Sequence, residues 1–150
     1  MEMMGEQLIA LPQQAVWDAL NDPEILKQCI PGCESVEKVS DDEYRMTMVA
    51  AVGPVKAKFT GKLTIVNPVP PDSYALAFEG TGGVAGFGKG TAEVSLTQDS
   101  DTVTLLTYKA TATVGGKIAQ IGSRLIDGVA RKMAEAFFAK FTAAVTKVGE

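Results

Sequence analysis

The last quarter of the sequence, from Gly115 to about Val148, limits the possible folds more than any other stretch. It contains no proline, and its apolar residues recur every three or four positions, as in an amphipathic α-helix. These apolar positions are Ile118, Ile121, Leu125, Val129, Met133, Ala136, Phe137, Phe141 and Ala144. A helix over this stretch spans roughly 40–45 Å. We therefore expect the remaining chain to supply a broad apolar surface against which the helix packs.

Two glycines inside this stretch are unusual for a core helix. Gly122 and Gly128 each cost about 1 kcal/mol relative to alanine in a helix interior. Such a cost favours either the close approach of another backbone or space left beside the helix. Ordinary packing of a helix on a sheet is the alternative. The Gly115-Gly116 pair ahead of them is typical of a turn from strand to helix.

Length and composition are those of one soluble globular domain covering residues 1–150. Hydrophobic residues make up 46% of the chain and charged residues 21%. The formal net charge of −4 argues against a nucleic-acid partner. Residues 117–150 nevertheless carry six Lys/Arg and three Asp/Glu, so the helix could meet an acidic partner or a membrane surface, or present an ordinary solvated face. Neither a signal peptide nor an apolar run of about 18 residues is present, so we expect a cytoplasmic protein.

Ahead of the helix, the hydrophobic period changes from about 3.6 residues to 2, which indicates a sheet. The clearest strand is 55–65, where apolar and polar residues alternate strictly, as in an antiparallel sheet with one wet face. A first strand over 3–10 and two short helices, starting at Pro12 and Pro23, come earlier. The expected order is β-α-α, then six consecutive antiparallel strands, then the long helix. This order predicts an α+β fold with a bent seven-stranded sheet and helices on one side.

The residues expected on the helix-facing side of the sheet differ widely in size. The large ones are Tyr44, Phe59, Phe78 and Tyr108, and the small ones are Ala50, Ala57, Gly61, Ala92, Ala110 and Ala112. A filled core would carry more Leu, Ile and Val. Small residues leave volume for a small-molecule cavity, with methionines as adaptable lining and tyrosine hydroxyls as orienting groups. Alternatively, large helix side chains such as Phe137 and Phe141 fill this volume, and the residues alone leave both interpretations open.

The glycine-rich run GTGGVAGFGKG at 80–90 does not fit a dinucleotide site. Such a site needs its glycines between a strand and a helix, so that the helix N-terminus faces the pyrophosphate. Here the following segment, TAEVSLT, alternates as a strand. We expect instead a flexible hairpin tip that could act as a lid, with Phe87 at its apex.

Few residues are equipped for catalysis or metal binding. The absence of histidine excludes Ser-His-Asp and Cys-His chemistry and removes the commonest metal ligand. Glu43, Glu79 and Glu93 fall on the outward side of their strands, so no internal general acid or base is expected. Cys29 and Cys33 do not make a zinc site without histidine, and we expect them to stay thiols, with Cys29 buried. We therefore expect a binding protein with no catalytic residues, metal site or cofactor, and not an enzyme.

Several segments, spread over nearly the whole chain, carry a resemblance to a known family. They are LPQQAVWDALNDPEIL (11–26), CIPGCESVE (29–37), VGPVKAKFTGKLTI (52–65), GTGGVAGFGKGTAEVSL (80–96), TLLTYKATATVGGKIAQIGSRLI (104–126) and FFAKF (137–141). Together they resemble the CoxG-like family, the G subunit of carbon monoxide dehydrogenase, within the START-like superfamily (SRPBCC, with the polyketide cyclases and Bet v 1). The resemblance implies a helix-grip fold, in which a seven-stranded antiparallel sheet wraps around the C-terminal helix with a cavity between.

The resemblance also implies a function. Proteins of this family are encoded alongside the molybdenum-containing carbon monoxide dehydrogenase or related molybdenum hydroxylases. They are thought to act as accessory proteins that recruit the enzyme to the membrane or carry a hydrophobic quinone that accepts its electrons. We therefore expect this chain to bind a quinone or lipid-like molecule and to contact the dehydrogenase subunits. Some members carry a long C-terminal extension implicated in membrane attachment. This sequence ends at Glu150 without one, so any peripheral membrane contact is expected to be transient, through the helix or a loop.

The expected ligand-lining residues come from the sheet and from the first and last helices. They are Trp17, Tyr44, Met46, Met48, Phe59, Phe78, Phe87, Tyr108, Ile121, Leu125, Val129 and Met133. Two other functions stay open. One is a docking or assembly protein that binds no ligand, and the other is a cyclase- or hydrolase-like enzyme such as other members of the superfamily.

Overall fold

The computed structural model describes residues 1–148, with side chains described through Val145. Seven strands, three α-helices and two short 3₁₀ helices follow one another in this part of the chain. They are β1 (Glu2–Ile9), α1 (Gln13–Leu20), α2 (Pro23–Cys29), β2 (Cys33–Lys38), β3 (Glu43–Val52), β4 (Val55–Val69), β5 (Ser73–Thr81), η1 (Gly83–Ala85), β6 (Phe87–Ser100), β7 (Val103–Gly115), η2 (Gly116–Ile121) and α3 (Ser123–Val148). The predicted order of elements is confirmed.

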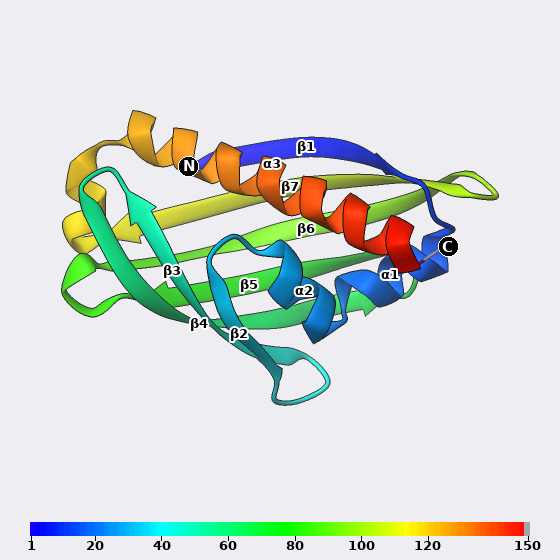
Figure 1. Ribbon diagram of the computed structural model, residues 1–150, viewed down its shortest axis with the longest axis horizontal. Helices are drawn as coiled ribbons and strands as arrows, with labels where there is room; N and C mark the ends of the chain where they lie inside the picture. Colours follow the sequence, from blue (N-terminus) through cyan, green and yellow to red (C-terminus); the bar gives the residue numbers. More distant parts are fainter. Residues whose placement is uncertain (149–150) are drawn as a thin grey trace.

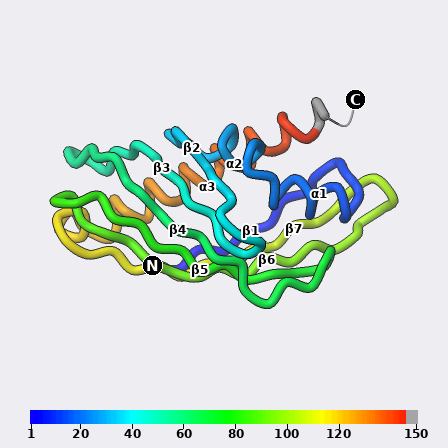
Figure 2. Tube along the Cα trace, turned by 90° about the horizontal axis from the view of Figure 1, so that it is seen from below, coloured from blue at the N-terminus to red at the C-terminus, as the bar shows by residue number. Residues whose placement is uncertain are grey.

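All seven strands form one antiparallel sheet in the order β1-β7-β6-β5-β4-β3-β2, so six strands follow in sequence and β1 adds to the edge beside β7. The sheet bends around α3, which crosses one of its faces from end to end (Figures 1 and 2). The face toward α3 is called the inner face below, and the opposite face the outer face. The predicted α+β architecture, a bent seven-stranded sheet with helices on one side, is confirmed.

The strict alternation of β4 sets which residues face α3. Directly opposite residues in neighbouring strands share a face of the sheet, and Phe59 pairs with Met48, Leu63 with Phe78, and Gly61 with Gly80. The inner face therefore carries the apolar set of each strand. The lysines of β4 alternate with this set and lie on the outer face.

The fully packed core lies at one end of the inner face, beside α1 and α2. There the last turns of α3 meet the ends of the strands. The buried cluster comprises Ile9, Val16, Ala19, Leu20, Cys29, Tyr74, Val94, Leu96, Leu106, Phe141 and Val145. Two polar groups at this end are satisfied by backbone carbonyls, because the Tyr44 hydroxyl donates to the Asn21 carbonyl and the Thr104 hydroxyl to the Leu11 carbonyl, each at 2.7 Å. The strongest packing of α3 is thus concentrated in its C-terminal half.

The long helix is shorter than the sequence pattern predicts. Residues 116–121 form the 3₁₀ helix η2, and the α-helix begins only at Ser123. The break falls at Gly122, whose φ of 109° is open to glycine but strained for other residues. A Cβ added at Gly122 or Gly128 would meet no neighbour within 4 Å. Neither glycine therefore marks a close backbone approach: Gly122 serves the turn, and Gly128 leaves open space beside α3.

Three aromatic rings of the inner face lie over glycines. A Cβ on Gly5 would come 2.7 Å from the hydroxyl oxygen of Tyr108, and one on Gly90 would come 2.7 Å from the Phe78 ring. A Cβ on Gly82 would come 2.6 Å from the Phe59 ring. Because no side chain stands beneath them, the rings lie down against the sheet, which leaves more room between the sheet and α3.

We expect Phe141→Ala to lower the free energy of unfolding by about 3–5 kcal/mol, because Phe141 is fully buried in the core cluster and its removal leaves a cavity. Urea unfolding followed by circular dichroism measures this change. Val84→Ala is the matched control, since Val84 is 89% exposed and its truncation should change stability by less than about 0.5 kcal/mol. Equal effects of the two variants would contradict this account of the core.

We also expect Gly5→Ala to destabilise the protein by about 1–3 kcal/mol, because the new methyl group would push the Tyr108 ring off the sheet. The near-ultraviolet circular dichroism of the tyrosines should change with it. Gly80→Ala is the control on the same face, where the nearest atom to a new Cβ is 3.5 Å away, an ordinary contact. A neutral Gly5→Ala variant with an unchanged spectrum would show that the ring does not depend on this glycine.

Candidate functional site

The backbone of α3 approaches the sheet most closely at its flanks. Besides α2 and η2, its principal contacts are with β1 at one edge and with β3 near the other, so that it bridges the strands between them. Both views show α3 spanning the sheet in this way (Figures 1 and 2). The region enclosed by the inner face and the first half of α3 is called the interlayer space below.

Apolar residues line the interlayer space without being fully buried. Away from the core cluster, Tyr44 and Val52 are buried, but most inner-face residues are half-buried: Met3, Met46, Met48, Ala50, Ala57, Phe59, Leu63, Phe78, Ala92, Ala110, Ala112 and Val114. A side chain that lies beneath a helix and still keeps part of its surface in contact with solvent has water or open space next to it. The interlayer space is therefore open to solvent at this end, in contrast to the sealed core at the other.

Glycines form the centre of the wall. Gly61 of β4, Gly80 of β5 and Gly88 of β6 lie side by side in one row across three strands, with Met46 and Val114 at the ends of the row. The next rows contribute small residues at Gly90, Ala92, Ala110 and Ala112. A wall without large side chains at its centre has room for a flat apolar molecule.

The residues predicted to line a ligand fall into two main groups, one on the inner face of the sheet and one along η2 and the start of α3. Met46, Met48, Phe59, Phe78 and Tyr108 all lie on the inner face and are half-buried. The α3 residues Leu125 and Val129, with Ile121 just before them, line a groove of about 370 Å³ along the start of the helix, together with Gly122, Arg124, Gly128 and Lys132. Met133 follows one turn later and is half-buried as well.

Three of the predicted residues lie elsewhere. Trp17 packs edge-on against Tyr74 at a centroid distance of 5.1 Å, within the packed end of the molecule. Tyr44 is 1% exposed, and its hydroxyl is engaged by the Asn21 carbonyl, so it is not an orienting group for a ligand. Phe87 begins β6 on the outer face, where its ring covers Gly115, because the residue parity of β6 directs 88, 90 and 92 inward. The apex of the hairpin is occupied by η1 instead.

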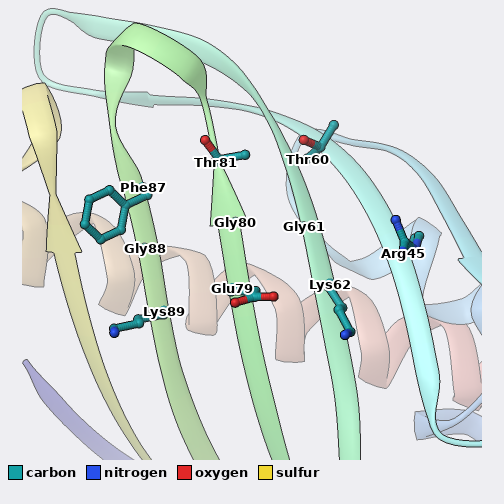
Figure 3. Close-up of a pocket in the computed structure, with 10 residues that line it drawn as sticks. All are labelled: Arg45, Thr60, Gly61, Lys62, Glu79, Gly80, Thr81, Phe87, Gly88 and Lys89. Carbon is teal, nitrogen blue, oxygen red and sulfur yellow. The ribbon is translucent and has the colours of Figure 1, made fainter.

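The outer face holds a separate pocket of about 520 Å³ (Figure 3). Arg45, Lys62, Glu79 and Lys89 lie in one row across four strands, and Phe87 lies beside them. Glu43 accepts from both Arg45 (3.5 Å) and Lys62 (3.3 Å). As predicted, Glu43, Glu79 and Glu93 lie on the outer side of their strands, away from the interlayer space.

Burial raises the pKa of several groups that are uncharged at neutral pH. The Cys29 thiol is fully buried, and desolvation raises its pKa despite the opposing charge of Lys140. Desolvation also raises the pKa of the Cys33 thiol and of the Tyr44 hydroxyl, the latter with help from the nearby Asp22 carboxylate. These thiols therefore stay protonated at neutral pH and are poor nucleophiles.

Neither a metal cluster nor a membrane span is found in the part of the chain that the structure describes. Within it, no group of three or more His, Cys, Asp and Glu side chains is placed to hold a metal ion. No helix within residues 1–148 combines the length and apolar character needed to cross a bilayer.

Sequence reasoning missed how strongly the aromatic–glycine pairs shape the wall. The run at 80–90 forms the tip of the β5–β6 hairpin, as the sequence predicts, but Gly82 and Gly90 also receive the Phe59 and Phe78 rings and Gly80 and Gly88 belong to the glycine row. The signal in the sequence was the alternation of glycines at 80, 82, 86, 88 and 90, which places most of them on one face once the register is known. Phe138, which stacks on Tyr108 at 5.4 Å, was also not singled out.

Solved structures of similar fold cover almost the entire chain. A conserved protein from Geobacillus kaustophilus is 35% identical, with 98% of this chain and 96% of that chain covered and a TM-score of 0.91. A START superfamily protein from Mycobacterium smegmatis is 12% identical, with 98% of each chain covered and a TM-score of 0.76. The Zhui aromatase/cyclase from Streptomyces sp. R1128 is 13% identical, with 100% and 96% covered and a TM-score of 0.71. The last two show the fold alone, and they confirm the START-like helix-grip arrangement.

Comparison with curated proteins gives no match. The comparison with protein families matches residues 5–146 to the family of the carbon monoxide dehydrogenase G subunit (CoxG). This match spans the first strand through the last turns of α3 and includes every segment that lines the interlayer space. The chain therefore belongs to the CoxG family of carbon monoxide dehydrogenase.

Proposed function

We propose that this protein is a non-enzymatic accessory of a molybdenum-containing carbon monoxide dehydrogenase or a related hydroxylase. It holds a quinone or lipid-like molecule in the interlayer space, and it serves electron transfer to quinone or peripheral recruitment of the enzyme to the membrane. The observation that carries the proposal is the half-buried apolar wall beneath the first half of α3. Membership of the CoxG family supports the choice of partner.

The chemistry of the wall suits a quinone better than a polar metabolite. Phe59 and Phe78 present ring surfaces close to a glycine floor, so a flat ring can stack without displacing them, whereas the Tyr108 ring is stacked on Phe138. Met46 and Met48 have flexible thioether side chains that adapt to an isoprenoid tail. Tyr108 also supplies a hydroxyl that can donate to a quinone carbonyl. Apolar burial then provides most of the binding free energy, at about 25 cal/mol per Å².

The same wall argues for binding without catalysis. The glutamates of β3, β5 and β6 lie on the outer face, and the described thiols have raised pKa values. General acid–base or nucleophilic chemistry needs a titratable group against the substrate. The aromatase/cyclase with a similar fold is only 13% identical, so the likeness shows the fold and lends no support to an enzymatic activity of this chain.

We expect Ala110→Phe to weaken binding of a menaquinone or ubiquinone analogue at least tenfold, because Ala110 lies on the inner face opposite Ala92 and the new ring would occupy the interlayer space. Quenching of intrinsic fluorescence or equilibrium dialysis measures the dissociation constant. The matched control is Thr111→Phe, the next residue of β7, which is exposed on the outer face and should leave binding unchanged. If the protein carries no quinone or lipid on gentle purification and binds none in titration, the proposed ligand is wrong.

A second function, docking to the dehydrogenase without a ligand, is favoured by the outer-face pocket with its exposed cations and Phe87. The two functions differ in an assay that couples carbon monoxide oxidation to quinone reduction. We expect wild type and Thr111→Phe to support quinone reduction and Ala110→Phe to fail while still co-purifying with the dehydrogenase. Full activity with Ala110→Phe would favour docking alone.

A further inference from the structure

One end of the molecule gathers three loops that are distant in sequence. These are the turn between β3 and β4 (52–55), the η1 loop (82–86) and the segment from the end of β7 to the first turn of α3 (115–125) (Figures 1 and 2). A Cβ on Gly53 would lie 2.9 Å from a Leu125 methyl group, so the first loop touches the third. A Cβ on Gly116 would lie 2.7 Å from the Cα of Gly86, so the second loop touches the third as well. These three loops together are called the tip.

The tip exposes large apolar side chains. Val84 is 89% exposed at the apex of η1, Phe87 is 49% exposed at the start of β6, and Leu125 is 44% exposed on the first turns of α3. Each comes from a different segment, and the contacts between the loops hold the segments together. Exposing such side chains to water is unfavourable, so an apolar surface that covered them would be stabilised by the contact.

The tip is also the cationic end of an acidic protein. The segments that run into it, 49–62, 80–92 and 110–126, contain six of the 14 Lys/Arg residues of the chain and none of its 18 Asp/Glu residues, with Glu79, Glu93 and Asp127 directly adjoining their bounds. The six are Lys56, Lys58, Lys62, Lys89, Lys117 and Arg124. Lys58 is paired with Glu34 and Lys62 with Glu43. The remaining four form no ion pair with any carboxylate of residues 1–145.

From these observations we propose that the tip is a docking surface for an anionic phospholipid bilayer, with Val84, Phe87 and Leu125 entering the interfacial region and the unpaired cations meeting the headgroups. Exposed apolar side chains on loops that also carry Lys117 and Arg124, with Lys56 and Lys89 in the adjoining strands, match the order of layers in such a membrane, apolar below and anionic above. A folded protein partner would more often offer carboxylates to pair with and a continuous apolar patch to cover. The charge of the whole chain repels the same membrane, so the orientation is fixed by the tip.

The position of the tip connects membrane docking with ligand exchange, an inference that rests on the proposed function. The groove at the start of α3, lined by Ile121, Leu125 and Val129, reaches the tip, and so do the open rows of the inner face. A ligand leaving the interlayer space by this end enters the bilayer without crossing water. Docking therefore makes the tip the exchange route for a lipophilic ligand.

Sedimentation with vesicles tests the proposal without any quinone present, so it succeeds or fails independently of ligand binding. We expect the full chain to bind vesicles of phosphatidylcholine mixed with phosphatidylglycerol, to bind phosphatidylcholine alone far more weakly, and to lose binding at high salt. Lys117→Gln with Arg124→Gln should lower the partition coefficient roughly 20–30-fold, at about fivefold for each charge. Val84→Asp should lower the partition coefficient further, because it replaces the most exposed of the three apolar side chains with a carboxylate.

Matched controls lie at the opposite end of the molecule. Lys27→Gln with Lys140→Gln changes the net charge equally on α2 and the second half of α3, and Val69→Asp alters a 53% exposed valine at the end of β4. Both controls should bind vesicles like wild type, and unchanged melting temperatures show that all variants fold. Absence of preference for anionic vesicles overturns the proposal. So does equal loss in tip and control variants, or tip variants that bind vesicles normally but release the dehydrogenase, which would assign the tip to a protein partner.

Discussion

The structure depends on the unequal packing of α3 along its length. Phe141 and Val145 are buried with the strand ends and with α1, and each large apolar side chain buried there contributes about 1.5–3 kcal/mol. The first half of the helix contributes no residue to this cluster. Because one end is held firmly, the other can stay apart from the wall without loss of the fold. The sealed core and the open space are therefore two consequences of one arrangement.

The shape of the inner face beneath the first half of α3 depends on positions that lack a side chain. The row Gly61, Gly80 and Gly88 removes side chains from three adjacent strands, and the rings of Phe59, Phe78 and Tyr108 lie over other glycines instead of rising toward α3. Glycine weakens a strand because it has no side chain to pack and gains most freedom on unfolding. A sheet with several glycines on one face is less stable but leaves more volume between that face and the helix. The packed end of α3 offsets that loss.

The sequence was sufficient to predict the fold, because strict alternation in β4 and the helical period after residue 117 are local signals. The sequence also predicted which strand residues share the inner face, because the alternation of apolar and polar residues within one strand shows which side chains point the same way, whatever strands lie beside it. It failed for three residues for identifiable reasons. Phe87 belongs to the strand β6, whose alternation places it on the outer face, and not to the apex of the hairpin. Tyr44 donates to a carbonyl of the loop after α1, and Trp17 packs against Tyr74 far along the chain, so these two positions depend on tertiary contacts that no local period contains.

The distribution of charged residues along the molecule parallels the distribution of packing, from the packed end beside α1 and α2 to the tip. The three loops of the tip contain Lys117 and Arg124 and no Asp or Glu, while Asp72, Asp99 and Asp101 lie in or beside the turns at the other end of the sheet. At the tip, the three apolar side chains of Val84, Phe87 and Leu125 are exposed. A protein that only needed solubility would place charges of both signs there. A protein that passes an apolar molecule to a negatively charged membrane needs the arrangement found here, in which the least packed end is also the cationic one.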